Sequence, residues 1–68
     1  MSVAKVSEIS STSTKSFEDA IEKGIARASK TLRNVRSAWI KEQHVRLENG
    51  KLAAYQVNMM VTFVLDDE

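Results

Sequence analysis

Apolar positions recur with a helical spacing in the first half of the chain. Ser16 stands just before this run and is a good N-cap, and Asp19 lies three residues later, where a capping box has its acidic side chain. The spacing of three and four residues lines one face of an amphipathic helix, which is predicted from Ser16 to about Arg33. Gly24 lies on that face, so the helix backbone is expected to approach a sheet closely. The face consists of Phe17, Ala20, Ile21, Gly24, Ile25, Ala28 and Leu32.

The segment before this helix alternates with a period of two and is rich in β-branched residues. Residues Val3 to Ile9 are therefore predicted as a short first strand. Residues 10–16, with the sequence SSTSTKS, are predicted as a loop that leads into the helix.

The second half of the chain predicts a hairpin of two long strands. After an exit over residues 34–37, strands are predicted from Ala38 to Leu47 and from Leu52 to Leu65. Residues 48–51 contain Asn-Gly, the strongest short signal for a hairpin turn. Residues 66–68 are all acidic and are predicted as a solvated tail.

The third predicted strand has one face that is more apolar than the other. Its expected core face is Tyr55, Val57, Met59, Val61, Phe63 and Leu65, and its other face is Ala54, Gln56, Asn58, Met60, Thr62 and Val64. The fold class is thus α+β with the order β-α-β-β. One helix lies on a three-stranded antiparallel sheet, in a single domain over residues 1–68. One helix cannot cover both faces of such a sheet, so the second face and the strand edges need partners.

Chain length and composition also favour self-association. A chain of 68 residues rarely builds a sufficient core alone and usually needs disulfides, a metal or oligomerisation. The chain has no cysteine and one histidine, His44, which excludes disulfides and leaves too few ligands for a histidine-rich metal site.

The charge balance excludes several classes of function. Ten basic and nine acidic residues give a net charge of +1, too balanced for an electrostatic nucleic-acid binder. No apolar run is long enough for a membrane span, and the N-terminal segment does not look like a secretory signal, so the expected compartment is the cytoplasm. No catalytic triad, phosphate loop or paired-carboxylate motif is present, and we expect no enzyme.

Trp39 is the candidate that stands out by chemistry, because it is the only tryptophan. It fits either core or interface packing or a stacking platform for a flat aromatic ligand. Gln56 is either a surface glutamine or an amide that reads the polar edge of a heterocycle. Arg46 is either an ordinary surface residue or a partner for an acid or a phosphate. Trp39 and Arg46 are an odd number of residues apart, so either a bulge intervenes or they lie on opposite faces.

A basic cluster at the end of the predicted helix has two interpretations as well. It is either a solvated helix face or a binding site for a phosphate-bearing ligand. Its members are Arg27, Lys30, Arg33 and Arg36.

Taken together, these segments resemble the dodecins, small flavin-binding proteins of bacteria and archaea. The resemblance covers nearly the whole chain. Its segments are VSEISSTSTKSFEDAI, GIARASKTLRNV, Trp39, YQV at 55–57 and VTFVLDD at the end. It implies a β-α-β-β fold that assembles into a hollow homododecamer, with flavins bound in pairs near the axes that relate subunits.

The resemblance also implies roles for individual residues. Trp39 would stack on the isoalloxazine ring of riboflavin or FMN, Gln56 would bond its pyrimidine edge, and Arg46 would lie near its tail. The implied function is storage of flavin without turnover, with photochemistry quenched by electron transfer from the indole. Coenzyme A is implied as a second ligand. Its implied residues are Arg27, Thr31, Leu32 and Arg33, although Val64 stands where relatives that carry coenzyme A have an arginine. The alternative is a structural homo-oligomer, or a coenzyme A or phosphate binder, with little flavin affinity.

Overall fold

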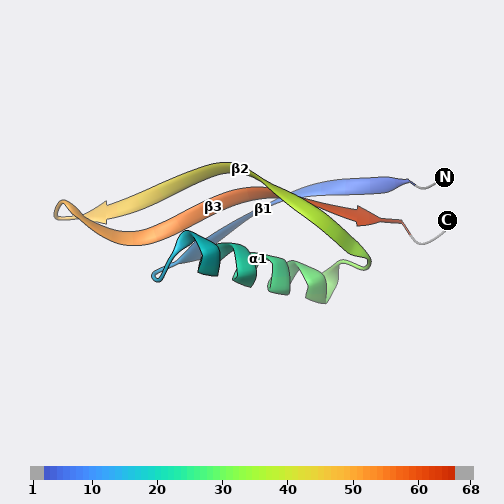
Figure 1. Cartoon of the computed structure of the whole chain (residues 1–68), viewed down its shortest axis with the longest axis horizontal. Coiled ribbons are helices and arrows are strands. Elements are labelled where there is room, and N and C mark those ends of the chain that lie inside the picture. The colour runs from blue at the N-terminus through green and yellow to red at the C-terminus, as the bar shows by residue number, and fades with distance from the viewer. Residues whose placement is uncertain (1–2, 66–68) are drawn as a thin grey trace.

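Four secondary-structure elements make up the computed structural model, which describes residues 3–65 (Figure 1). They are β1 (Ala4–Ser13), α1 (Phe17–Thr31), β2 (Val35–Glu48) and β3 (Lys51–Val64). The sheet order is β1-β3-β2 with both pairs antiparallel, and α1 lies along one face. The predicted order β-α-β-β is confirmed. No helix in this part of the chain is long and apolar enough to cross a membrane.

The core lies between α1 and the central strand β3. Alternate residues of β3, Val57, Met59 and Val61, are fully buried, as is Ala20 of α1. Packed around them are Ile9, Phe17, Ile21, Ile25, Leu32, Val35 and Ala38. The predicted core faces of the helix and of the third strand are therefore confirmed, because successive side chains of a strand point to opposite sides.

The start of α1 is fixed by two serines and one aspartate. Ser16 is the N-cap, and its hydroxyl accepts a hydrogen bond from the Asp19 N–H at 2.9 Å. Ser13, at the end of β1, donates to Asp19 Oδ2 at 2.5 Å. The Ser13 hydrogen bond is the main cause that lowers the pKa of Asp19 from its ordinary value of 3.8, and nearby Lys23 adds to it. A carboxylate at this helix end also suits the helix dipole.

Two predicted boundaries were wrong. Residues 10–13 belong to β1 and not to a loop, because their backbone pairs with Asn58 to Tyr55 of β3. Residues 35–37 likewise belong to β2, which begins opposite Phe63. In both places pairing with the long central strand outweighs a composition that is typical of loops.

The predicted hairpin turn is confirmed. Asn49 and Gly50 have φ values of 52° and 77°, which match a type I′ turn, the two-residue turn whose twist suits a hairpin. The hairpin end of β2 and β3 extends past α1 (Figure 1). The predicted acidic tail, residues 66–68, lies outside the described residues.

Gly24 is the point where α1 comes closest to the sheet, as its position on the apolar face predicted. A Cβ at this position would overlap Met59 Cε and lie 3.0 Å from Ser11 Cβ. A larger residue here would have to displace Met59 Cε, the end of a flexible side chain, and press against Ser11 of β1.

Gly24→Ala is expected to destabilise the protein by about 1 kcal/mol. Overpacking costs about 1–3 kcal/mol, while alanine gains about 1 kcal/mol of helix propensity. Denaturant unfolding at one fixed protein concentration measures the change. Ala26→Gly, at an exposed position of the same helix, isolates the propensity effect. A more stable Gly24→Ala variant would contradict the close approach.

Asp19→Asn is expected to reduce the loss of stability at acid pH. The pKa of Asp19 is lower in the folded state than its unfolded value of 3.8. The stability that its carboxylate contributes is therefore complete above the unfolded pKa and is lost as pH falls through the lower folded pKa. Unfolding midpoints between about pH 5 and about pH 2 measure this. Glu22→Gln, on the same helix, is the control. Parallel profiles for the wild type and Asp19→Asn would show that the Ser13–Asp19 contact adds no pH-dependent stability.

Candidate functional site

The candidate site is the sheet face that α1 leaves uncovered, which we call the open face. Residues directly opposite each other in antiparallel strands point to the same side. Because Val57 and Met59 point to α1, the alternate residues of β3 and their partners point away from it. The open face therefore contains Glu8, Ser10 and Thr12 of β1, Trp39, Glu42, His44 and Arg46 of β2, and Ala54, Gln56, Asn58 and Met60 of β3.

A bulge in β2 brings Trp39 and Arg46 to this face together. The register shifts between Ile40 and Glu42, so Lys41 is an extra residue there. Trp39 then opposes Met60 and Arg46 opposes Ala54, and both partners are on the open face. Of the two alternatives that the sequence left open, the structure has the bulge.

Trp39 is not part of the chain's core. Its side chain is 53% exposed, on the side of the sheet away from α1. Packing within one chain therefore does not explain this tryptophan, and the interpretations that remain are an interface between chains and a ligand platform.

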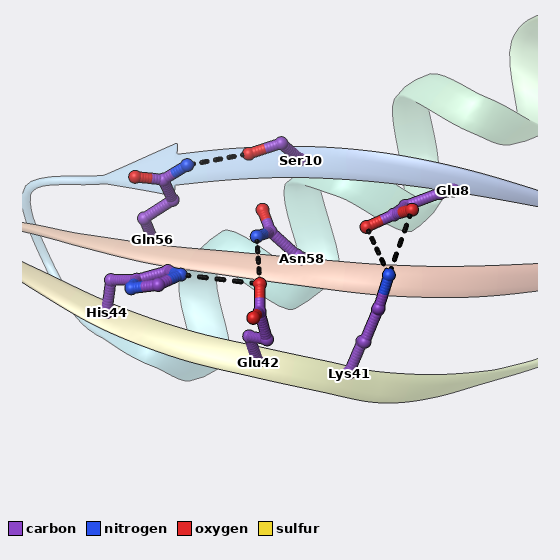
Figure 2. Close-up of polar contacts among 7 residues, drawn as sticks. All are labelled: Glu8, Ser10, Lys41, Glu42, His44, Gln56 and Asn58. Atoms are coloured by element: carbon purple, nitrogen blue, oxygen red, sulfur yellow. Dashed lines mark hydrogen bonds and ion pairs between the residues drawn. The ribbon is translucent and has the colours of Figure 1, made fainter.

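Polar side chains connect the three strands across the open face (Figure 2). Gln56 Nε2 donates to Ser10 Oγ at 2.9 Å, and Asn58 Nδ2 donates to Glu42 Oε1 at 2.8 Å. Glu42 Oε1 also lies 3.6 Å from His44 Nε2. Gln56 and His44, which oppose each other in the register, are therefore each in contact with a polar neighbour on this face.

An ion pair lies nearer to Trp39 on the same face. Lys41 Nζ lies 3.3 Å from Glu8 Oε1, so the extra residue of the bulge connects β2 to β1 across β3 (Figure 2). Both side chains are about half exposed, so the pair contributes little stability.

Sequence reasoning missed Ser10 and Glu42 as parts of this face, whereas it placed Asn58 correctly on the same face of the third strand as Gln56. It placed Ser10 in a loop and gave His44 no role, whereas the structure places Glu42 beside the imidazole. The spacing of two residues between Glu42 and His44 in a predicted strand was the available signal.

Glu42 stays ionised to lower pH than an ordinary glutamate. The hydrogen bond from Asn58 is the main cause that lowers its pKa, followed by the one from His44. The carboxylate is therefore a fixed negative group on the open face over the physiological pH range.

The three residues expected to bind flavin share the open face but do not converge at one point. Trp39 opposes Met60, which is four residues from Gln56 along β3, a distance of about 13 Å at the rise of a strand. Arg46 is closer to Gln56, as a diagonal neighbour across the two strands at about 7–8 Å. One chain thus presents Gln56 and Arg46 together, with Trp39 farther along the same face.

The basic cluster lies elsewhere, beside a groove between α1 and β1. The groove has a volume of about 510 Å³, and Arg27, Thr31 and Leu32 line it together with Lys23. Arg33 lines a smaller hollow of about 190 Å³ instead, which it shares with Thr31, Leu32 and Val64. The four residues expected to bind coenzyme A are therefore divided between two hollows. Lys30 and Arg36 line neither.

No group of three histidine, aspartate or glutamate side chains within residues 3–65 is arranged to hold a metal ion. On the open face, Glu8 contacts Lys41, and Glu42 contacts His44 and Asn58.

Comparison with known proteins identifies the family. The family model for dodecin matches residues 3–66. The chain belongs to the dodecin family. A dodecin from Streptomyces davaonensis is 38% identical, with a TM-score of 0.91 over 96% of each chain. A Thermus thermophilus protein is 34% identical, with a TM-score of 0.93 over 100% of each chain. A search of curated proteins found no match.

Members of this family are small, oligomeric proteins that bind small ligands. A similar Mycobacterium tuberculosis protein, 32% identical with a TM-score of 0.82 over 94% of this chain and 91% of its own, is described as a calcium dodecin with a novel calcium-binding site.

Proposed function

We propose that this dodecin stores a flavin, riboflavin or FMN, on the open face without chemical turnover. The observation that carries the proposal is the position of Trp39, a half-exposed indole on the same uncovered face as Gln56 and Arg46. An exposed aromatic ring on a flat sheet offers a stacking surface to a flat ligand.

The three residues supply complementary contacts. Trp39 stacks on the isoalloxazine ring, and its electron-rich indole quenches the excited flavin by electron transfer. Gln56 donates one amide hydrogen to Ser10, which leaves its second hydrogen and its carbonyl oxygen for the polar edge of the ring. Arg46 binds a phosphate or a ribityl hydroxyl through its guanidinium. No nucleophile or base is required, because nothing is transformed.

The site is completed by assembly. Trp39 and Gln56 of one chain are about 13 Å apart along the sheet, so a second copy that faces the first across a symmetry axis brings the two kinds of contact to each ring. We infer a homododecamer in the cytoplasm, as the family resemblance implies.

The hairpin beyond α1 provides a surface for that assembly. Leu47 and Leu52, paired across β2 and β3, are 61% and 55% exposed, and Val45 is 46% exposed. Apolar side chains grouped on a sheet that no helix covers are typical of a subunit interface.

A second candidate function rests on the groove between α1 and β1. Lys23 and Arg27 flank it, and Ile9, Ala28 and Leu32 form apolar parts of its lining. That combination suits a ligand with a phosphate and an apolar arm, such as coenzyme A. Val64 adds no charge to the neighbouring hollow. We therefore rank this function below flavin storage.

Trp39→Ala is expected to weaken flavin binding by about tenfold to a hundredfold, since loss of one aromatic stacking contact costs about 1–3 kcal/mol. A riboflavin titration of the apo-protein measures it, with flavin and tryptophan fluorescence followed together. With the wild type, both fluorescence signals should fall and reach saturation at about one flavin per chain. Ile40→Ala, the neighbouring residue on the opposite face, is the matched control.

Two outcomes would contradict flavin storage. Unchanged flavin affinity in Trp39→Ala would exclude stacking on the indole. Loss of the oligomer in Trp39→Ala, with no flavin binding by the wild type, would support a structural role at an interface. If coenzyme A binds instead and Arg27→Ala abolishes that binding, the second candidate function holds.

Leu47→Ser combined with Leu52→Ser is expected to shift the assembly towards smaller species, because apolar area at the hairpin would no longer be buried. Sedimentation velocity over a range of concentrations measures the distribution. Glu48→Ser, in the same hairpin, is the control. An unchanged distribution in the double variant would place the subunit interface elsewhere.

A further inference from the structure

His44 lies on the open face beside Gln56, yet flavin storage as proposed above assigns it no role. It lies directly opposite Gln56 in the register, and Arg46 follows two residues later on the same face. Its Nε2 lies 3.6 Å from Glu42 Oε1 (Figure 2). Histidine is the side chain whose charge ordinarily changes between about pH 5 and 8. A side chain of variable charge therefore lies next to both Gln56 and Arg46.

The other charged groups around His44 are few. On β2 they are Glu42 and Arg46, one negative and one positive. The residues of β3 beside it, Gln56 and Asn58, are neutral, as are the neighbouring β1 residues Ser10 and Thr12. Glu8 and Lys41 pair with each other nearer to Trp39, and α1 lies on the opposite face of the sheet.

The local charge of the open face therefore depends on His44. With a neutral imidazole, Glu42 and Arg46 cancel, whereas with an imidazolium the same three residues carry one net positive charge. The lowered pKa of Glu42 keeps this carboxylate ionised when the imidazole takes up its proton, so protonation adds charge to the face and does not merely move a proton between the two residues.

We propose that His44 is a specificity-determining residue of the flavin site, which favours the phosphate-bearing FMN over uncharged riboflavin as pH falls. The inference rests on the proposed flavin site. A phosphate bound at Arg46 would lie about 7 Å from His44, the spacing of alternate residues on one face of a strand. At that distance a second positive charge in a solvated setting improves binding of one negative charge by roughly threefold, and by more where water is excluded.

The phosphate of FMN titrates in the same range, with a second pKa of about 6, and this opposes the effect of His44. The test therefore compares variants at the same pH and not one protein across pH alone. His44→Gln keeps a polar side chain of similar size without charge. His44→Lys carries a permanent positive charge.

The experiment is a fluorescence titration of the full-length assembled protein with FMN and with riboflavin, at about pH 8 and about pH 5.5. Light scattering on each variant verifies the assembly. At the lower pH, the FMN-to-riboflavin affinity ratio of the wild type should exceed that of His44→Gln by roughly threefold or more, and at the higher pH the two should agree. His44→Lys should keep the higher ratio at both pH values.

Two results would overturn the proposal, and they can be told apart. Equal ratios for the wild type and His44→Gln at both pH values, with flavin still bound, would exclude His44 as a specificity residue and leave flavin storage intact. Absence of quenching by either flavin in the wild type would overturn flavin storage and, with it, the role of His44.

Discussion

The whole structure depends on one packing constraint, the burial of one side of β3 under a single helix. Val57, Met59 and Val61 point to α1 and are fully buried, and Gly24 lets the helix come close enough to cover them. Because β3 is the central strand, its alternation fixes the orientation of β1 and β2 through the register. The alternate side chains of β3 then point to the face that α1 does not cover.

That uncovered face is the basis of both the proposed ligand site and the proposed assembly. The bulge at Lys41 turns the two parts of β2 so that Trp39 and Arg46 share the open face, while the hydrogen bond from Gln56 to Ser10 holds the amide in place. A monomer would leave Trp39 in water and the hairpin beyond α1 without a partner. The two proposed properties, flavin binding and self-association, thus rest on the same incomplete coverage of the sheet.

Much of this could be predicted from the sequence, and the errors have physical causes. Hydrophobic residues that recur every 3.6 positions predicted the helix, and those that recur every second position predicted the strands; together they predicted the core. Asn49-Gly50 predicted the turn. These signals could be found because they are local in the sequence. The extension of β1 through residues 10–13 could not be predicted, because serine-rich strands form only when a neighbouring strand supplies the pairing. The bulge has no glycine or proline to mark it. The contacts of His44 depend on the register that the bulge sets.

The central claim is that the ligand lies on the open face, in contact with Trp39. A crystal structure of the assembled protein soaked with riboflavin tests it most directly. The account predicts a ring stacked on Trp39, on the side of the sheet away from α1, with its polar edge at Gln56 of the same or a neighbouring chain. A ring seated instead in the groove between α1 and β1, with the Trp39 indole covered only by protein, would contradict it.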